Sequence, residues 1–205
     1  MEALGIYIHI PVCNQKCDYC DFYSIPYSDI NNEVNSTDHL HKNSRDNLNF
    51  WNQYADKLEI DLQFKAKQLK RKVFLYSIFF GGGSPSLVPP KILHRIINGI
   101  KSFFPHKTSQ VEITLEVNPE DISITFINEI YDAGVNRVSM GLQSLNEEDL
   151  KYLGREGSVE CNFKALDILN ASKIKNTNAD VIYGITGQKW KNIEYTIHTA
   201  INSGV

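Results

Sequence analysis

The chain has 205 residues, of which 42% are hydrophobic and 22% are charged, so we expect one domain with a sizeable core. Its 21 basic and 24 acidic residues give a net charge of −3, which lacks the basic excess of proteins that bind nucleic acids or anionic membranes. The longest nearly apolar run, residues 73–80, is far shorter than the ~18 residues of a membrane span, and the acidic Glu2 stands where a signal peptide needs a cation, so we expect a cytoplasmic protein without a membrane span.

Short β-rich runs alternate with helical patterns along the chain. The expected strands cover residues 6–10, 73–80, 111–117, 136–142 and 178–182. The expected helices, with apolar residues three and four apart, cover residues 48–71, 91–104, 124–133, 159–171 and 191–203. Residues 28–47 are too polar to fold independently, which favours a surface loop. Five strands, each followed by a helix, predict an α/β fold with a parallel sheet and right-handed crossovers.

Three of the predicted strands alternate between apolar and polar residues, whereas strands buried on both faces are apolar throughout. In the strand at residues 111–117, for example, Ile113 and Leu115 lie on one face, and Thr114 and Glu116 lie on the other. We infer a cavity that holds a polar ligand, because helices after every strand argue against an open sheet. The alternative is a half-exposed sheet whose polar face meets solvent.

Three of the four cysteines, Cys13, Cys17 and Cys20, are closely spaced just after the first predicted strand. Thiolates on so short a tether can converge on one metal centre, and thiolates hold iron-sulfur clusters. A four-iron cubane bound in this way keeps one iron without a protein ligand, where a small molecule can bind. Zinc held by these cysteines and His9 is the competing interpretation, and three unpaired buried thiols are the simplest one. Cys161, alone in a helical pattern, is expected to be a buried structural thiol.

A glycine run, Gly81 to Gly83, follows the second predicted strand. Consecutive glycines let a backbone approach a ligand closely, and their N–H groups can bind a carboxylate. In parallel α/β folds, ligands bind at the carboxyl ends of the strands. Glu116 and Gln143 lie near the ends of the third and fourth predicted strands, so we expect them on the same rim as the cysteines.

Residues 7–20, YIHIPVCNQKCDYC, resemble the signature of the radical S-adenosylmethionine superfamily. Within it the chain is similar to the coproporphyrinogen III oxidase-like group, and most similar to the HemW-type haem chaperones. The resemblance implies that residues 1–205 form the radical S-adenosylmethionine core domain, an open partial (β/α)6 barrel of parallel strands with about five βα units present. It also implies a 4Fe-4S cluster held by Cys13, Cys17 and Cys20, whose free iron binds S-adenosylmethionine.

The family's contacts to S-adenosylmethionine can be carried over to matching motif positions. The Gly-Gly-Gly-Ser-Pro motif assigns the methionine part to Gly82, Gly83 and Ser84. Further contacts to this cofactor are implied for Tyr7, Tyr19, Glu116, Gln143, Arg155 and Asp180.

Some positions depart from the family's pattern. The oxygen-independent coproporphyrinogen oxidases carry a fourth cysteine two residues after the third, where this chain has Phe22, so the chaperone branch is favoured over the decarboxylase. Glu156 and Gly157 occupy a region where a histidine is expected, and residues 184–188 read GITGQ in place of GLPGQ.

The family continues through a sixth strand and a C-terminal domain, whereas this sequence ends at Val205. We therefore expect a C-terminally truncated chain, without that domain and with weakened haem binding.

Three hypotheses follow: a haem chaperone, an enzyme that cleaves S-adenosylmethionine to a radical and acts on a porphyrinogen, and a zinc-stabilised scaffold. The first two imply a haem or porphyrin ligand, an electron donor and, for the chaperone, a haem-accepting protein.

Overall fold

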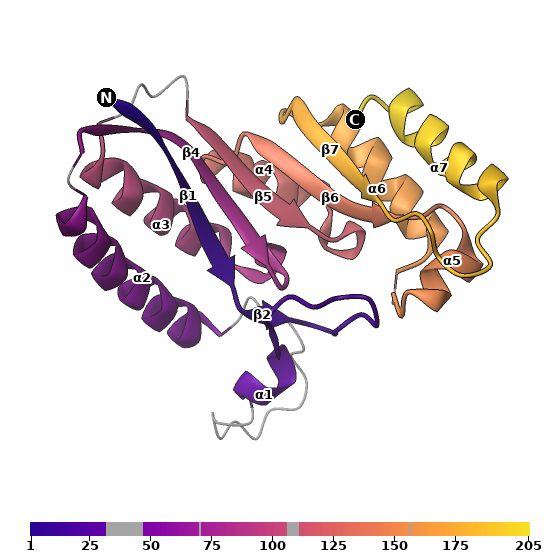
Figure 1. Cartoon of the computed structure of the whole chain (residues 1–205), viewed down its shortest axis with the longest axis horizontal. Helices are drawn as coiled ribbons and strands as arrows, with labels where there is room; N and C mark the ends of the chain where they lie inside the picture. The colour runs from indigo at the N-terminus through magenta and orange to yellow at the C-terminus, as the bar shows by residue number, and fades with distance from the viewer. Residues whose placement is uncertain (32–46, 70, 106–110, 156) are drawn as a thin grey trace.

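The computed structural model describes residues 1–31, 47–69, 71–105, 111–155 and 157–205. Its centre is a parallel five-stranded sheet in the order β1-β4-β5-β6-β7. The strands point the same way, so their carboxyl ends meet at one edge (Figure 1). They are β1 (Glu2–Ile10), β4 (Val73–Gly82), β5 (Glu112–Val117), β6 (Arg137–Gln143) and β7 (Asn176–Val181). Beyond the end of β1, the short strands β2 (Val12–Cys13) and β3 (Ile25–Pro26) pair with each other at the base of the cysteine loop.

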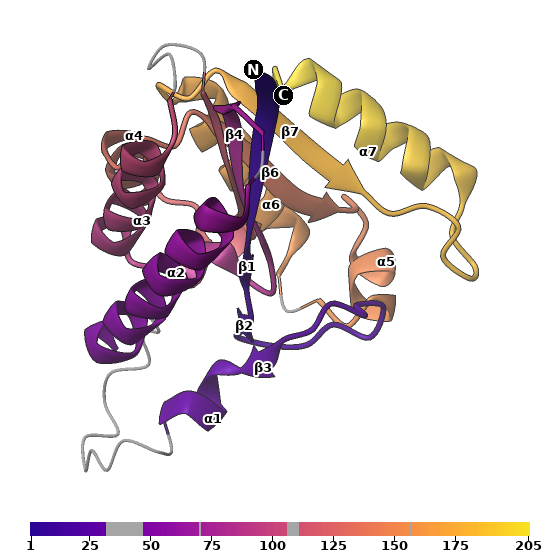
Figure 2. The same cartoon turned by 60° about the vertical axis from the view of Figure 1, so that its left-hand side comes forward.

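Helices connect the strands and cover one face of the sheet, with α2, α3 and α4 on the same side (Figure 2). The α-helices are α1 (Tyr27–Asn31), α2 (Leu48–Gln68), α3 (Pro90–Phe103), α4 (Ile124–Asp132), α5 (Glu147–Tyr152), α6 (Val159–Ala171) and α7 (Trp190–Asn202). Two short 3-10 helices, η2 (Pro85–Leu87) and η3 (Pro119–Asp121), follow β4 and β5 directly.

The core lies between the helices and the apolar face of the sheet. Leu115 and Val117 of β5, and Met140 and Leu142 of β6, are all fully or almost fully buried there. These residues are two positions apart in each strand and therefore share a face. Burial of one such side chain stabilises the fold by roughly 1.5–3 kcal/mol, so the alternation fixes which face of each strand meets the helices.

Local capping sets the ends of the connecting helices. At the start of α4 the hydroxyl of Ser123 accepts a hydrogen bond from the Phe126 amide at 3.1 Å, and Ser158 does the same for Cys161 in α6. After α4 the chain turns at Gly134, whose φ of +107° is one that L side chains rarely adopt. A glycine at this position lets the chain leave the helix without the strain that a Cβ would add.

The predicted α/β class, the parallel sheet and all five strands are confirmed, with shifted boundaries. β1 begins at Glu2 because its pairing with β4 extends back to Val73. Helix α5 was not predicted, because one and a half turns are too short for a periodic signal. Within the polar stretch 28–47, residues 28–31 belong to α1 and were wrongly expected to be loop, and residues 32–46 lie outside the described residues.

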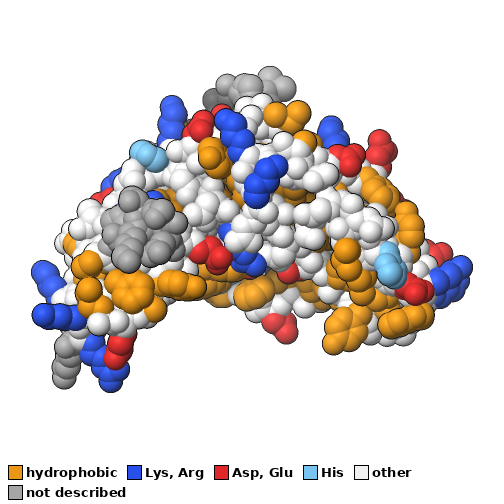
Figure 3. Space-filling model, turned by 90° about the horizontal axis from the view of Figure 1, so that it is seen from above, with side chains coloured by type: hydrophobic (Ala, Val, Ile, Leu, Met, Phe, Trp, Pro, Cys, Tyr) orange, Lys and Arg blue, Asp and Glu red, His pale blue; other side chains and the backbone are white. Residues whose placement is uncertain are grey.

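The opposite face of the sheet is polar and partly open. Thr114 and Ser139 are buried on it, whereas Asp180 is exposed. Figure 3, which looks onto the end where the strands begin, shows apolar side chains along the lower edge of that view. Exposed apolar residues include Tyr7 in β1 and Ile201 in α7. No helix among the described residues combines the length and apolarity needed to cross a bilayer.

Candidate functional site

A cavity of about 240 Å³ lies at the carboxyl edge of the sheet, next to the cysteine loop. The polar strand faces and the glycine run predict a ligand site at this position. All but one of the predicted site residues line it: Cys13, Cys17, Tyr19, Cys20, Gly82, Gly83, Ser84, Glu116, Gln143, Arg155 and Asp180. These residues come from loops and strand ends that are far apart in the sequence. The edge where parallel strands end brings them together.

Tyr7 is the exception, because it is absent from the cavity wall. Its ring stacks on Phe79 at a centroid distance of 6.0 Å, and its hydroxyl lies 3.2 Å from Nδ1 of His9. Tyr7 is 53% exposed on the open face of the sheet. Its ring nevertheless lies close to Glu116, since a Cβ on Gly81 would lie 2.9 Å from the Tyr7 ring and 3.1 Å from the Glu116 carboxylate. The contact of Tyr7 with the cofactor therefore stays a prediction.

The three clustered cysteines are unpaired and partly exposed, and all face the same cavity. Their loop is fixed by a hydrogen bond from the Cys20 amide to the Cys17 carbonyl at 3.1 Å, and by one from the Asp18 amide to the Leu153 carbonyl at 3.3 Å. Three thiols on one wall form a donor set that fits an iron-sulfur cluster, which spreads its ligands over several irons.

His9, the fourth ligand of the zinc alternative, has hydrogen-bond partners of its own. Its Nε2 lies 2.8 Å from the Tyr23 carbonyl, which can only accept, so Nε2 carries the proton. Its Nδ1 can accept from the hydroxyl of Tyr7. His9 is not among the residues that line the cavity with the three cysteines. Among the residues that the structure describes, no three His, Cys, Asp or Glu side chains gather closely enough to hold a single metal ion.

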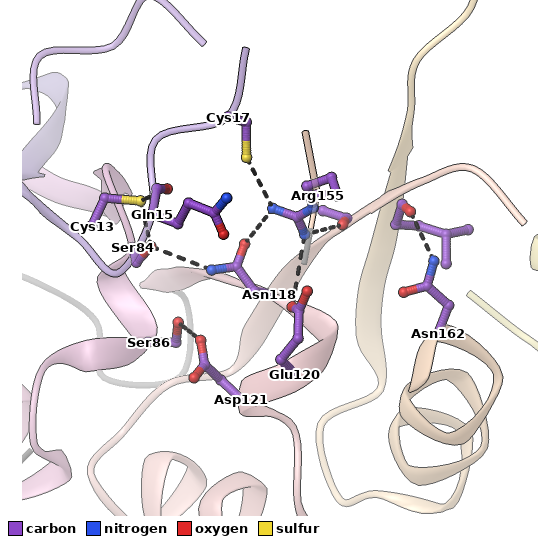
Figure 4. A network of polar contacts seen from close by, with 12 residues as sticks. Cys13, Gln15, Cys17, Ser84, Ser86, Asn118, Glu120, Asp121, Arg155 and Asn162 are labelled. Carbon is purple, nitrogen blue, oxygen red and sulfur yellow. Dashed lines mark hydrogen bonds and ion pairs between the residues drawn. The ribbon is translucent and has the colours of Figure 1, made fainter. Parts of the chain in front are cut away.

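A chain of polar contacts joins two of the cysteines across the cavity (Figure 4). The sulfur of Cys13 lies 3.1 Å from the hydroxyl of Ser84, which accepts from Nδ2 of Asn118 at 3.3 Å. The Oδ1 of Asn118 accepts from Nη1 of Arg155 at 3.1 Å, and the same nitrogen lies 4.0 Å from the sulfur of Cys17. The side chain of Asn118 therefore bridges the glycine-run segment and the buried arginine.

Arg155 is held on several sides. Its Nη2 donates to the Gly141 carbonyl at 3.0 Å and lies 3.8 Å from the carboxylate of Glu120. Its side chain is only 10% exposed, so this is a buried, partnered cation and not the surface cation that an arginine usually is. Nearby, burial raises the pKa of Tyr19 to about 12, and the adjacent thiols of Cys17 and Cys20 add to this effect against the opposing charge of Arg155. Tyr19 is therefore a neutral donor at physiological pH.

The backbone amides of the glycine run and of Ser84 have partners within the protein. The amides of Gly83 and Ser84 donate to the carbonyls of Ile10 and Val12 at 2.8 and 2.7 Å, and the amide of Gly82 donates to Glu116 at 3.2 Å. These three N–H groups have partners within the protein, and the partner of the Gly82 amide is a carboxylate. The contact of Gly82, Gly83 and Ser84 with the methionine part of the cofactor stays a prediction. A Cβ on Gly83 would lie 2.3 Å from the Val12 carbonyl oxygen, so glycine is required there by the packing of two backbone segments.

Two acidic side chains, Glu116 and Asp180, line the same cavity as the cysteines. Burial raises the pKa of Glu116, the Gly82 amide lowers it, and the nearby charge of Asp180 raises it further. The carboxylate of Asp180 accepts from Ser139 and Asn178, each at 3.1 Å and each at a different oxygen. Its plane is thereby fixed, which suits an acceptor for ligand hydroxyl groups.

Gln143 has the only positive φ, 62°, among the non-glycine residues that the structure describes. It ends β6 at a register shift relative to β7, and its carbonyl accepts from the Ile182 amide at 2.9 Å. Left-handed backbone at a non-glycine residue is strained, and such strain is concentrated at functional sites. The turn directs the side chain of Gln143 to the cavity.

Cys161 and Glu156 complete the comparison with the sequence predictions. Cys161 lies in the first turn of α6 and is partly exposed, so the expected full burial is wrong. Glu156 is outside the described residues. Sequence reasoning also missed Asn118 and Ser139 as site residues. Asn118 is two residues after Glu116, and Ser139 is two residues after Arg137, so each shares the polar face of its strand. This alternation was the signal that could have identified them.

Comparison with known proteins identifies the family. Residues 7–200 match the family described as Radical SAM superfamily. The chain belongs to the radical SAM superfamily. Membership implies a 4Fe-4S cluster and S-adenosylmethionine as cofactors, and the cavity contains thiols and polar groups suited to both.

Two curated relatives place this radical SAM chain more narrowly. It is 34% identical over 189 residues to the heme chaperone HemW of Haemophilus influenzae, covering 92% of this chain and 45% of that protein. It is 27% identical over 186 residues to the oxygen-independent coproporphyrinogen III oxidase of Paracoccus denitrificans, covering 91% of this chain and 37% of that protein. The chain therefore spans less than half the length of either relative.

A solved structure confirms the radical SAM architecture. The coproporphyrinogen III oxidase HemN of Escherichia coli matches with a TM-score of 0.76 at 24% identity, covering 98% of this chain and 42% of that one. At this identity the likeness establishes the fold, a radical SAM-type barrel of βα units, of which five parallel strands are present here.

Proposed function

We propose that this chain is the radical SAM core of a HemW-like haem chaperone, with a 4Fe-4S cluster held by Cys13, Cys17 and Cys20. The observation that carries the proposal is that these three unpaired thiols line one cavity together with Glu116 and Asp180. The similarity to heme chaperones supports the chaperone branch.

The protein's own residues bind and orient the cofactors. A bound 4Fe-4S cluster would supply an electron and an iron to which the amino and carboxylate groups of S-adenosylmethionine attach. Because the amides of Gly82, Gly83 and Ser84 are engaged, this segment would offer its carbonyls to the cofactor's ammonium group. Asp180, with its plane fixed by Ser139, would accept from ribose hydroxyls.

The remaining predicted contacts have supporting roles. The neutral hydroxyl of Tyr19 and the amide of Gln143 would hydrogen-bond polar groups of S-adenosylmethionine from opposite walls. Arg155 would place a positive charge beside the cysteine loop and the cofactor's carboxylate. Tyr7 would contact the cofactor from beside Glu116, on the open face of the sheet.

Phe22 supports the chaperone over the oxidase. It lines the cavity and is 56% exposed at the position where the oxidases carry a fourth cysteine. An exposed aromatic surface at the mouth of the cavity suits contact with a planar, apolar haem or porphyrin. An oxygen-independent coproporphyrinogen oxidase activity is the second candidate, supported by the 27% identity to such an enzyme.

Partners and location follow from the proposal. A chaperone of this kind needs a haem-accepting protein and, for the cluster, an electron donor. The unpaired thiols support a cytoplasmic location, because reducing compartments keep clustered cysteines free for metal binding.

Iron and sulfide analysis of anaerobically reconstituted chain tests the metal centre. Serine substitution of Cys13, Cys17 or Cys20 should abolish stoichiometric iron and sulfide and the brown absorbance. Cys161→Ser is the matched control, since its thiol lies in α6, and should retain full cluster content. Intact iron and sulfide in any of the three variants contradicts the proposed ligand set.

Haem and cofactor assays separate the two candidate functions. For the chaperone, titration with haem should show saturable binding, and Phe22→Ala should weaken it. For the oxidase, anaerobic reduction with S-adenosylmethionine and coproporphyrinogen III should yield 5'-deoxyadenosine and decarboxylated product. Decarboxylation without haem binding would reject the chaperone assignment.

A further inference from the structure

We propose that Asn118 is a positioning residue that makes Ser84 a hydrogen-bond donor to the sulfur of Cys13, and so raises the reduction potential of the cluster. The inference rests on the proposed cluster binding by the three cysteines. It assigns to Asn118 a role in setting the driving force for electron uptake at the site.

The direction of each hydrogen bond follows from the arginine at one end of the chain. A guanidinium can only donate, so the atom of Asn118 that lies 3.1 Å from Nη1 of Arg155 must be the amide oxygen. The amide nitrogen of Asn118 then faces Ser84 and donates to its hydroxyl oxygen at 3.3 Å. Arg155 is itself held by the Gly141 carbonyl, so the amide of Asn118 cannot flip without losing both contacts.

Ser84 has one hydroxyl hydrogen, and Asn118 does not compete for it. The hydrogen is therefore free to point at the sulfur of Cys13, 3.1 Å away. In the thiol form Cys13 also donates to the Gln15 carbonyl at 2.8 Å. As a cluster ligand Cys13 is a thiolate and can only accept, which leaves the hydroxyl of Ser84 as its donor in this chain of contacts.

Burial makes this donor effective. Ser84 is 2% exposed and the side chain of Arg155 is 10% exposed, so water does not replace the contacts easily. Hydrogen bonds to the sulfurs are among the factors that set the potential of an iron-sulfur cluster. A donor at a thiolate stabilises the reduced, more negative state and therefore raises the potential.

The test is the midpoint potential of the reconstituted full chain, measured by anaerobic titration with electron paramagnetic resonance. Ser84→Ala should shift the one-electron reduction equilibrium about tenfold toward the oxidised cluster, a fall of about 59 mV. Ser84→Thr keeps the hydroxyl and should keep the wild-type potential. In wild type and Ser84→Thr, deuterium exchange should reveal an exchangeable hydrogen coupled to the cluster, and Ser84→Ala should lose it.

Asn118→Asp tests the relay itself. An aspartate only accepts, so it would take the hydrogen of Ser84 away from Cys13 and lower the potential. Its added negative charge would also lower the potential. The difference between the double variant Asn118→Asp/Ser84→Ala and Ser84→Ala measures that contribution alone. The relay predicts a larger effect of Asn118→Asp when Ser84 is present than when it is absent.

Ser86→Ala is the matched control, because Ser86 lines the same cavity but donates to Asp121 at 2.6 Å, and it should leave the potential unchanged. Equal potentials in wild type and Ser84→Ala, or independent additive effects of the two substitutions, overturn the inference while the cluster proposal stands. Absence of iron and sulfide from the wild-type chain overturns both. If Ser84→Ala fails to hold a cluster, the Ser84→Thr and Asn118→Asp variants decide. The inference then requires a lower potential in Asn118→Asp and an unchanged potential in Ser84→Thr.

Discussion

Because the backbone of Gln143 is left-handed, we predict that Gln143→Gly is more stable than Gln143→Ala. This is the reverse of the usual order of the two substitutions. At ordinary strand positions glycine is less stable than alanine by about 0.5–1 kcal/mol, because it loses more conformational freedom on folding. With a Cβ, however, left-handed backbone costs roughly 1–2 kcal/mol. Because Gln143 has a φ of 62°, Gln143→Gly should be more stable than Gln143→Ala by about 0.5–1 kcal/mol, the difference between these two effects.

Both substitutions remove the same buried amide, so the comparison isolates the backbone. Gln143 is 9% exposed, and loss of its side chain affects the two variants equally. The matched control is Thr177, which lies within β7 and pairs with Val138. There Thr177→Gly should be less stable than Thr177→Ala by about 0.5–1 kcal/mol.

Urea unfolding of the cluster-free chain under anaerobic, reducing conditions measures these differences as shifts of midpoint at constant slope. A difference of 1 kcal/mol corresponds to about 2–4 °C in melting temperature for a chain of this size. If Gln143→Ala equals or exceeds Gln143→Gly in stability, the strained turn is not present in solution. S-adenosylmethionine affinity should fall to the same extent in both variants, since neither has the amide.

Three other substitutions have defined outcomes. Gly83→Ala should destabilise the chain by roughly 1–3 kcal/mol or more in urea unfolding, because its Cβ would lie 2.3 Å from the Val12 carbonyl oxygen. Glu116→Gln should stabilise the cluster-free chain at pH 7 but not at pH 4. Burial raises the folded-state pKa of Glu116, so the native state loses stability as the pH rises from the usual pKa of a glutamic acid through the raised one. Ser139→Ala should weaken S-adenosylmethionine binding about fivefold in calorimetry, since one oxygen of Asp180 loses its hydrogen-bond donor.

Gly83→Ala has a matched comparison, and each of the three predictions has an outcome that would contradict it. Gly99 lies inside α3, with ordinary space for a Cβ at 3.9 Å from Glu59, so Gly99→Ala should stabilise the chain by about 0.8–1 kcal/mol. Equal effects of alanine at Gly83 and Gly99 contradict the packing argument. A stability gain from Glu116→Gln that is independent of pH contradicts the burial argument. Unchanged cofactor affinity in Ser139→Ala shows that Asp180 does not need a fixed orientation.

Local sequence determined the elements and the donor atoms of the site. Period-two and helical patterns depend on neighbours a few residues apart, so they predicted five strands and their helices to within a few residues. The spacing of Cys13, Cys17 and Cys20 likewise placed three thiols on one loop. Helix α5 and the early start of β1 depend on cap and strand pairing, which such patterns detect poorly.

Tertiary structure decided which of these atoms meet and which are already engaged. The amides of Gly83 and Ser84 were free donors by sequence, but they donate to the carbonyls of Ile10 and Val12, residues more than seventy positions earlier. Tyr7 has the alternation predicted for a site residue, but only the structure shows that its exposed ring lies beside Glu116. Asn118 gains its role only because Ser84 and Arg155 approach it from distant segments. A sequence fixes what each side chain can donate or accept, whereas long-range packing fixes the partner, because hydrogen bonds depend on distance and direction in space.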